Sequence, residues 1–293
     1  MLQAVLSVVT PIFIIAGIGY LWHRRGQPFD TETVGSVVMY IGSPCLIYSS
    51  LTSNAPELDT LLTMASSAVL VIVLSAAAGT VFLRLLGWPV TTFLPAIVQA
   101  NGGNMGLPVV LLAFGETGLA LGMAYFFVLS VSQYTLGLSI SSGTFSLGAL
   151  LKQPVIWAVV VVLLVLTTGI QLPDWINDTA DILGGLTIPA MLLMLGTSLA
   201  RLELTDVAQS LTITLLRLAL GLALGWAAIY LFDLTGVMAG VVLLQATMPS
   251  AVFNYVFAER YDREPQKVAA VIVLSTLLSV LTLPFFVAWA LTL

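Results

Sequence analysis

Long apolar segments fill almost the whole sequence, and only short polar stretches separate them. A soluble chain is typically about 25% charged, whereas this chain of 293 residues is 8% charged and 59% hydrophobic, with a mean hydropathy of +1.08. No soluble core could bury so much apolar surface, and about 20 apolar residues suffice for a helix to cross a bilayer. The sequence therefore predicts an all-α integral membrane protein whose surrounding partner is the lipid bilayer.

The apolar segments divide into ten predicted membrane helices. A β-barrel is excluded because the apolar runs are continuous rather than alternating. The start of the chain also lacks the basic region of a cleavable signal peptide. The predicted helices span 2–22, 33–52, 60–86, 90–114, 117–140, 154–172, 179–200, 206–232, 235–258 and 266–292.

Basic residues predict the orientation of these helices, because cytoplasmic loops of membrane proteins are enriched in Lys and Arg. Loops after even-numbered helices contain no Lys or Arg and carry acidic residues such as Glu57 and Asp233. We therefore expect a multi-pass protein of the inner (cytoplasmic) membrane with both termini outside the cytoplasm. Loops after odd-numbered helices contain Arg24, Arg25, Arg84, Lys152, Arg201, Arg260, Arg263 and Lys267.

Composition also excludes several classes of protein. The net charge of −5 excludes a nucleic-acid binder, and the single cysteine, Cys45, excludes a disulfide scaffold. The single histidine, His23, lies in the first loop, so no metal or catalytic cluster is expected and an enzyme is the least favoured class. No Asp or Glu lies in the middle of a predicted helix, so no buried carboxylate is expected to carry a proton. We expect no cofactor, and coupling to H⁺ or Na⁺ stays open.

Several short patterns recur at a nearly constant distance along the chain. Pro44 and Pro189 lie 145 residues apart, and the Val-Leu-Ser triplets that end at Ser130 and Ser275 share this offset. The Gln-Ala pairs that begin at Gln99 and Gln245 are 146 residues apart. The pattern predicts two repeats, residues 1–140 and 153–293. Because each would contain five helices, the second repeat would be inverted in the membrane, as is common in secondary transporters.

The fourth and ninth predicted helices each contain a cluster of helix-breaking and polar residues. Gly and Pro free backbone groups that lipid cannot satisfy, so such a break must face protein or water. A proline kink with small-residue packing would explain one such helix, but two in corresponding positions favour a central binding site. The candidate site residues are Asn101, Asn104, Pro108, Gln245, Thr247, Pro249, Ser250 and Asn254.

The chemistry of these clusters indicates an anionic ligand. Half-helix N-termini that meet at the membrane midplane each carry roughly half a positive charge. Asn side chains and Ser or Thr hydroxyls add neutral hydrogen-bond donors. This combination favours a carboxylate that is held without a full counter-charge, and therefore a small organic anion as the substrate.

Arg217 is the one basic residue inside a predicted helix. It lies about eleven residues into the eighth helix, or roughly 16 Å from its cytoplasmic end at 1.5 Å per residue. Two interpretations stay open. The side chain snorkels to the cytoplasmic headgroups, or it lines an inner vestibule and attracts an anionic substrate.

These patterns resemble the auxin efflux carrier family, which contains plant auxin exporters and bacterial carriers of malonate- or malate-like acids. Residues 11–20 are similar to its opening helix, and residues 41–44 resemble its proline-containing second helix. The residues Asn101, Gly106 and Pro108 match its first helix crossover, and residues 245–249 and 257–261 resemble the second crossover and its exit. The similarity covers essentially the whole chain.

The resemblance implies ten helices in two inverted five-helix repeats, with broken helices four and nine crossing at the substrate. Helices one, two, six and seven would form a scaffold that often dimerises, and helices three to five and eight to ten would form a moving transport domain. The implied activity is elevator-type transport of small organic anions such as malonate-like or auxin-like acids. Asn101 and Pro108 would lie at one crossover, and Pro249 and Asn254 at the other.

Two residues depart from the family pattern. Asn104 replaces an often apolar residue, which favours a smaller and more polar substrate than auxin, and Gly221 stands where a proline is expected. The main alternative is a sodium-coupled carrier similar to bile-acid symporters, with Gln245, Thr247 and Gln133 beside the sodium ion. A channel or a sensor is a further alternative, although no soluble domain is evident.

Overall fold

The computed structural model describes residues 1–54, 56–144, 147–170, 172–202 and 206–293, and every regular element within them is a helix. Seven helical segments in these ranges are long and apolar enough to cross a membrane. Two shorter apolar helices, Pro154–Thr168 and Gly236–Thr247, accompany them. The seven are Leu2–Arg24, Thr31–Ser53, Leu58–Leu85, Gly102–Ser142, Asp174–Arg201, Val207–Leu231 and Pro265–Ala290. The chain is thus an all-helical, multi-pass membrane protein.

The first half of the chain contains long helices joined by π-helical turns, which are marked η. The segments Val38–Gly42, Gly102–Gly106 and Gln133–Gly137 are such turns, single-turn π-helical stretches that adjoin the α-helices. The elements are α1 (Leu2–Arg24), α2 (Thr31–Val37), η1 (Val38–Gly42), α3 (Ser43–Asn54), α4 (Leu58–Leu85), α5 (Val90–Val98), η2 (Gly102–Gly106), α6 (Leu107–Ser132), η3 (Gln133–Gly137) and α7 (Leu138–Ser142).

The second half follows a similar plan without π-helical turns among its described residues. Its elements are α8 (Leu147–Leu151), α9 (Pro154–Thr168), α10 (Asp174–Gly185), α11 (Thr187–Arg201), α12 (Val207–Leu231), α13 (Gly236–Thr247), α14 (Phe253–Arg260) and α15 (Pro265–Ala290).

Most predicted helix ranges agree with these bounds, and the differences have local causes. The expected ends at 114 and 117 fall within α6, which bends sharply at Gly115 because this residue has φ 65° and ψ −157°. The helix expected over 154–172 ends at Thr168, because Gly169 adopts a left-handed conformation and caps it. The helix expected from 179 begins at Asp174 instead.

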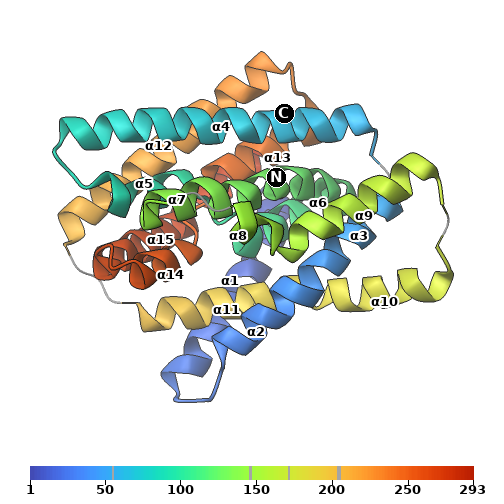
Figure 1. Ribbon diagram of the computed structural model, residues 1–293, viewed down its shortest axis with the longest axis horizontal. Helices are drawn as coiled ribbons and strands as arrows, with labels where there is room; N and C mark the ends of the chain where they lie inside the picture. Colours follow the sequence, from blue (N-terminus) through green and yellow to red (C-terminus); the bar gives the residue numbers. More distant parts are fainter. Residues whose placement is uncertain (55, 145–146, 171, 203–205) are drawn as a thin grey trace.

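The helices pack in two groups. The flanking group consists of α1–α3 and α9–α11, in which α1 packs on α11 and α3 packs on α9 and α10. The crossing group consists of α4–α7 and α12–α15, in which α4 packs on α5, α6 and α12, and α13 packs on α6, α12 and α15. In Figure 1 the helices α2, α10 and α11 lie along one side of the molecule and α4 along the other.

The core of the crossing group is α13. Every residue from Ala239 to Thr247 is buried, which is the pattern of a helix surrounded by protein. Its neighbours supply fully buried side chains such as Phe93, Met105 and Ile272. The interrupted segments of the chain are therefore held at the centre of the molecule.

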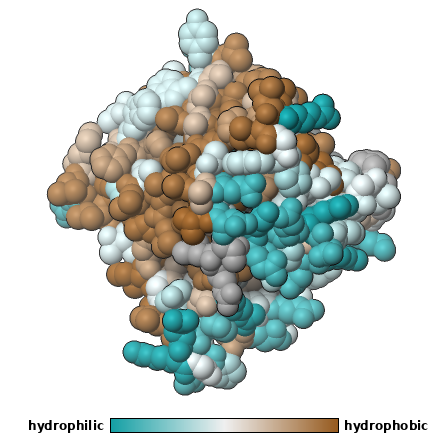
Figure 2. Space-filling model, turned by 90° about the vertical axis from the view of Figure 1, so that its left-hand side faces the viewer, coloured by the Kyte–Doolittle hydropathy of each residue, from teal (hydrophilic) through white to brown (hydrophobic). Residues whose placement is uncertain are grey.

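Several connections that carry basic residues lie at one end of the molecule. The C-terminal end of α4, the start of α12 and the α14–α15 connection are at the left of Figure 1. Figure 2 views this end and shows hydrophilic side chains gathered beside a broad hydrophobic area. Such a division is typical of a protein that emerges from lipid on a polar side.

Candidate functional site

Two interrupted helices cross at the centre of the molecule, at the two places where the sequence predicts interruptions. The helix α5 ends at Val98 and η2 begins at Gly102, while α13 ends at Thr247 and α14 begins at Phe253. The segments between them run antiparallel, with a single β-bridge between Ala100 and Ser250. We call this region the crossing: residues 99–101 and 248–252 with the helix ends that flank them.

Backbone hydrogen bonds hold the two extended segments together. The N–H of Asn101 donates to the carbonyl of Pro249 at 2.8 Å, and the N–H of Ala251 donates to the carbonyl of Gln99 at 3.0 Å. Nonhelical backbone inside a membrane protein needs internal partners because lipid offers none. Each segment supplies those partners for the other, so the crossing is stable only when both halves of the chain are in place.

Local sequence explains why the helices stop here. Pro249 has no N–H to continue α13, and Gly102 and Gly103 begin the tight turn η2. Pro108 lies farther along, as the second residue of α6, where a proline does not break a helix. Among the candidate site residues, Pro108 therefore shapes the helix that leaves the crossing and is not part of the bridge.

Four buried side-chain amides surround the bridge. Gln99, Asn101, Gln245 and Asn254 are each at most 3% exposed. Gln99 Oε1 accepts a hydrogen bond from the hydroxyl of Ser132 at 3.1 Å. Asn254 Nδ2 donates to the carbonyl of Gln99 at 3.3 Å and to the hydroxyl of Ser250 at 3.0 Å.

Each of these amides also presents a buried polar atom with no protein partner. These atoms are Gln99 Nε2, Asn101 Nδ2, Gln245 Nε2 and Oε1, and Asn254 Oδ1. A buried unsatisfied polar group costs about 1–3 kcal/mol, and native structures rarely keep several together without a role. Three of the five atoms are N–H donors. All five belong to residues at the crossing or at the helix ends that flank it, which supports a site for a ligand rich in acceptor atoms.

Asn104 is more exposed than the residues around it. It is the one residue in the range 101–110 that is not fully buried. It lies on η2, which packs against α11 of the flanking group. The side chain of Asn104 is thus placed near the boundary between the two helix groups.

The remaining candidate residues support the crossing. Gln245 lies so close to η2 that a Cβ on Gly106 would be 2.4 Å from its Oε1. Thr247 turns its hydroxyl back to its own helix and donates to the carbonyl of Leu243 at 2.8 Å. The N–H of Ser250 donates to the hydroxyl of Ser275 at 3.1 Å.

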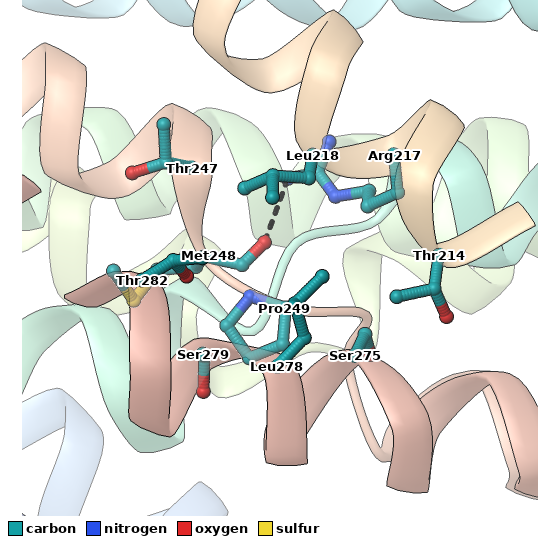
Figure 3. A pocket seen from close by; sticks show the side chains of 10 residues that line it. All are labelled: Thr214, Arg217, Leu218, Thr247, Met248, Pro249, Ser275, Leu278, Ser279 and Thr282. Carbon is teal, nitrogen blue, oxygen red and sulfur yellow. Dashed lines mark hydrogen bonds between the residues drawn. The ribbon is translucent and has the colours of Figure 1, made fainter. Parts of the chain in front are cut away.

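Arg217 lies inside the protein, so the snorkelling interpretation is wrong. The residue is 2% exposed. Its Nη1 donates to the carbonyl of Ile97 at 3.0 Å, and its Nη2 donates to the carbonyls of Ala246 at 3.0 Å and Met248 at 3.2 Å. Arg217 lines a small cavity of about 10 Å³ together with Met248 and Pro249. Figure 3 shows these three residues near one another. The bonds of Arg217 run to backbone carbonyls, and a role in an open vestibule stays a prediction.

Sequence reasoning missed three parts of this region. Ser132 and Ser275 form hydrogen bonds with residues of the crossing. Ser275 belongs to the repeated Val-Leu-Ser triplet, but it was not among the candidate site residues. Tyr134, Phe253 and Phe257 form a cluster of edge-to-face rings with centroids 5.3–6.3 Å apart. Phe253 opens α14, so this cluster lies beside the second half-helix N-terminus. The repeated triplet could have indicated Ser275, whereas Ser132 and Tyr134 lie more than 100 residues from the second crossing segment and carry no local signal.

The described parts of the chain contain no cluster of side chains that could bind a metal ion. No group of three or more His, Cys, Asp or Glu side chains lies together there. The ion pairs found among these residues join Lys267 to Asp206 and Glu264, and none of the three residues belongs to the crossing segments. The polar chemistry of the crossing consists of amides, hydroxyls, backbone groups and one guanidinium.

Comparison with known proteins shows similarity to membrane transport proteins. A family model described as "Membrane transport protein" matches residues 4–144 and 140–287. An "uncharacterized transporter" of Methanothermobacter thermautotrophicus is 26% identical over 298 residues, which cover 96% of each chain. An "uncharacterized transporter" of Methanocaldococcus jannaschii is 23% identical over 300 residues, covering 95% of this chain and 96% of the relative.

Proposed function

Because the chain belongs to the membrane transport protein family, which is of the auxin efflux carrier type, we propose that it is a secondary transporter of small organic anions. The substrate binds at the crossing and carries one or more carboxylates. Malonate-like acids and auxin-like weak acids are the two substrate classes to compare.

One observation carries this proposal: buried amide donors without partners lie where two helices begin. The helices η2 and α14 start at the crossing. The first N–H groups of a helix have no acceptor within it, although in α14 those of Asn254 and Tyr255 donate to the carbonyls of Ala251 and Val252. The dipoles of the two helices add roughly half a positive charge at each N-terminus. Together with Gln99 Nε2 and Asn101 Nδ2, they offer a carboxylate several donors and no fixed ion-pair partner, so the anion can also be released.

The packing of the helices supports an elevator-type movement. The crossing group contains both interrupted helices and their hydrogen-bonded bridge, so it can move as one body with the substrate. It contacts the flanking group through α1, α3 and α11, which pack against α6, α15 or η2. We propose that the flanking group is the fixed scaffold, through which two copies of the chain dimerise. Residues 1–140 and 153–293 would be the two inverted repeats, and each repeat contributes helices to both groups.

The proposed orientation follows from the basic connections. They would face the cytoplasm because positively charged loops are retained there. Both termini would then lie outside the cytoplasm, in the cell membrane. A cysteine introduced at either terminus and labelled with a membrane-impermeant reagent in intact cells tests this placement.

A thermal-shift measurement on the purified protein tests the substrate class. Each acid is paired with its neutral amide: malonate with malonamide, and indole acetate with indole acetamide. A ligand at 100 times its Kd stabilises the folded protein by about 2.7 kcal/mol, or roughly 4–5 °C for a chain of this size. A shift with an acid and none with its amide supports the proposal. Equal shifts, or no shift with any acid, contradict it.

Uptake into proteoliposomes then separates a carrier from a channel. A carrier gives saturable uptake of the radiolabelled acid that binds, and an excess of unlabelled acid competes with it. A channel gives conductance that does not saturate in the same range. The proposal requires the saturable behaviour.

A further inference from the structure

The C-terminal ends of both interrupted helices meet at one guanidinium group. Ile97 lies in the last turn of α5, and Ala246 lies in the last turn of α13. Arg217 donates to the carbonyls of both residues and to that of Met248, which follows α13. A single side chain from α12 therefore satisfies carbonyls that the two helix breaks leave without helical partners.

The charges at this point nearly balance without an acidic side chain. Each helix C-terminus carries roughly half a negative charge, and two such ends amount to about one charge. The guanidinium supplies one positive charge, and no carboxylate is paired with it in the described residues. A buried charge of this kind needs compensation; Nη1 and Nη2 of Arg217 have carbonyl partners, and Nε has none. Here the compensation comes from the two helix ends.

The surroundings of Arg217 otherwise have the character of a site for a hard cation. Figure 3 shows hydroxyl side chains around the same cavity as the arginine and the Met248 carbonyl. Oxygen ligands of this type suit alkali and alkaline-earth cations. In transporters with interrupted helices, unwound carbonyls and half-helix C-terminal ends coordinate the coupling sodium ion. The cavity-lining residues that carry a hydroxyl are Thr214, Thr247, Ser275, Ser279 and Thr282.

We propose that Arg217 is the resident cation of the crossing and takes the place of a dissolved coupling cation. The carbonyls of Ala246 and Met248 are engaged by its Nη2, so a sodium ion would have to displace a tethered charge to reach them. The crossing thus keeps its geometry, and binds its anion, without sodium. The statement about anion binding rests on the proposed function, whereas the statement about geometry does not.

The first test uses the wild-type protein and replaces the cation in the buffer. Melting temperature is measured in sodium chloride, potassium chloride and choline chloride of equal ionic strength, with and without the carboxylate that binds best. We expect the same melting temperature, and the same ligand-induced shift, in all three salts. Stabilisation or ligand binding that appears only with sodium overturns the proposal.

The second test removes the resident cation and offers a replacement. Arg217→Ala should lower the melting temperature by at least about 5 °C, and millimolar guanidinium or methylguanidinium should restore much of that loss. Arg217→Met fills the space with an uncharged chain, so it should be destabilised without any rescue. Rescue of neither variant, or equal rescue of both, contradicts the proposed role. A melting temperature of Arg217→Ala equal to that of the wild type does so as well.

Two further variants control for folding and for nonspecific effects. Arg201→Ala removes an exposed arginine that donates to the carbonyl of Phe29 at 2.9 Å, and guanidinium should not stabilise it. If Arg217→Ala does not fold, Arg217→Lys keeps one charge but fewer donors, and its melting temperature should lie below that of the wild type in every salt. A protein that passes these tests and binds no carboxylate would refute the proposed function alone.

Discussion

Gly221 lies one helical turn after Arg217 on α12, and a Cβ at position 221 would be 2.2 Å from the carbonyl oxygen of Ala246. That same carbonyl accepts a hydrogen bond from Arg217. The glycine therefore lets α12 approach the end of α13 closely enough for the guanidinium to reach it. This contact gives a physical reason for glycine at a position where the family pattern led us to expect proline.

Gly221→Ala should destabilise the protein and weaken ligand binding together. The obstacle is backbone, which cannot rotate away, and overpacking of this kind costs about 1–3 kcal/mol. Separation of α12 from α13 would also lengthen the bonds from Arg217. The measurement is the melting temperature with and without the carboxylate that binds best. Gly17→Ala on α1 is the control, because a Cβ there meets nothing within 4 Å. Equal behaviour of the two variants would refute the argument.

The positions of the helix breaks could be predicted from the sequence, and the partners across them could not. Amides and proline occur in both 99–108 and 245–254, and the first stretch also contains three glycines. These residues disfavour a regular helix for local reasons. The β-bridge between Ala100 and Ser250 depends on how the two halves pack, which no local pattern encodes.

Arg217 illustrates the same limit. A basic residue within an apolar helix indicates a special environment, but its acceptors are main-chain carbonyls 120, 29 and 31 residues away. Carbonyls are present at every position and leave no signature in a sequence. The sequence therefore identified the residue as unusual, while its contacts emerged only from the fold.

Asn101→Ala should weaken carboxylate binding about tenfold, which corresponds to about 1.4 kcal/mol. Its Nδ2 has no acceptor in the protein, so the substitution removes a donor to the ligand and little that stabilises the fold. Ser67→Ala is the control, because Ser67 is buried on α4 and donates only to the carbonyl of Thr63. Titration calorimetry with the acid that binds best measures both. An unchanged Kd for Asn101→Ala would remove this residue from the site.

Asn104→Leu should shift the substrate preference toward larger and less polar acids. The side chain is partly exposed on η2 near the flanking group. An apolar replacement can therefore be accommodated without the loss of a buried hydrogen bond. The ratio of Kd values for malonate, lactate and indole acetate is compared between the wild type and the variant. We expect relative affinity for indole acetate to rise. The same order of affinities in both proteins would show that Asn104 does not select the substrate.

Gly19→Ala should destabilise the flanking group and leave the crossing intact. A Cβ at this position would lie 2.3 Å from the carbonyl oxygen of Leu193 on α11, so α1 and α11 would have to separate. We expect a loss of about 1–3 kcal/mol with an unchanged Kd for the carboxylate. Gly17→Ala, two residues earlier on α1, again serves as the control. A large loss of affinity in Gly19→Ala would indicate that the two helix groups do not behave as separate bodies.

Protonation of Asp30 should loosen the start of α2. The hydroxyl of Thr33 and the N–H groups of Thr33 and Glu32 donate to its carboxylate, and they hold the pKa of Asp30 below its ordinary value. A lowered pKa in the folded state means that the stabilisation is present above the unfolded pKa of about 3.9. It is lost as the pH falls through the folded pKa.

Hydrogen exchange of the amides in residues 31–37 measures this effect. In Asp30→Asn the side chain resembles the protonated acid, so this variant should exchange faster than the wild type at neutral pH. The difference should close as the pH falls through the lowered folded pKa of Asp30, because the wild-type carboxylate then loses its charge. A difference that persists unchanged at low pH would show that the charge of Asp30 does not stabilise α2.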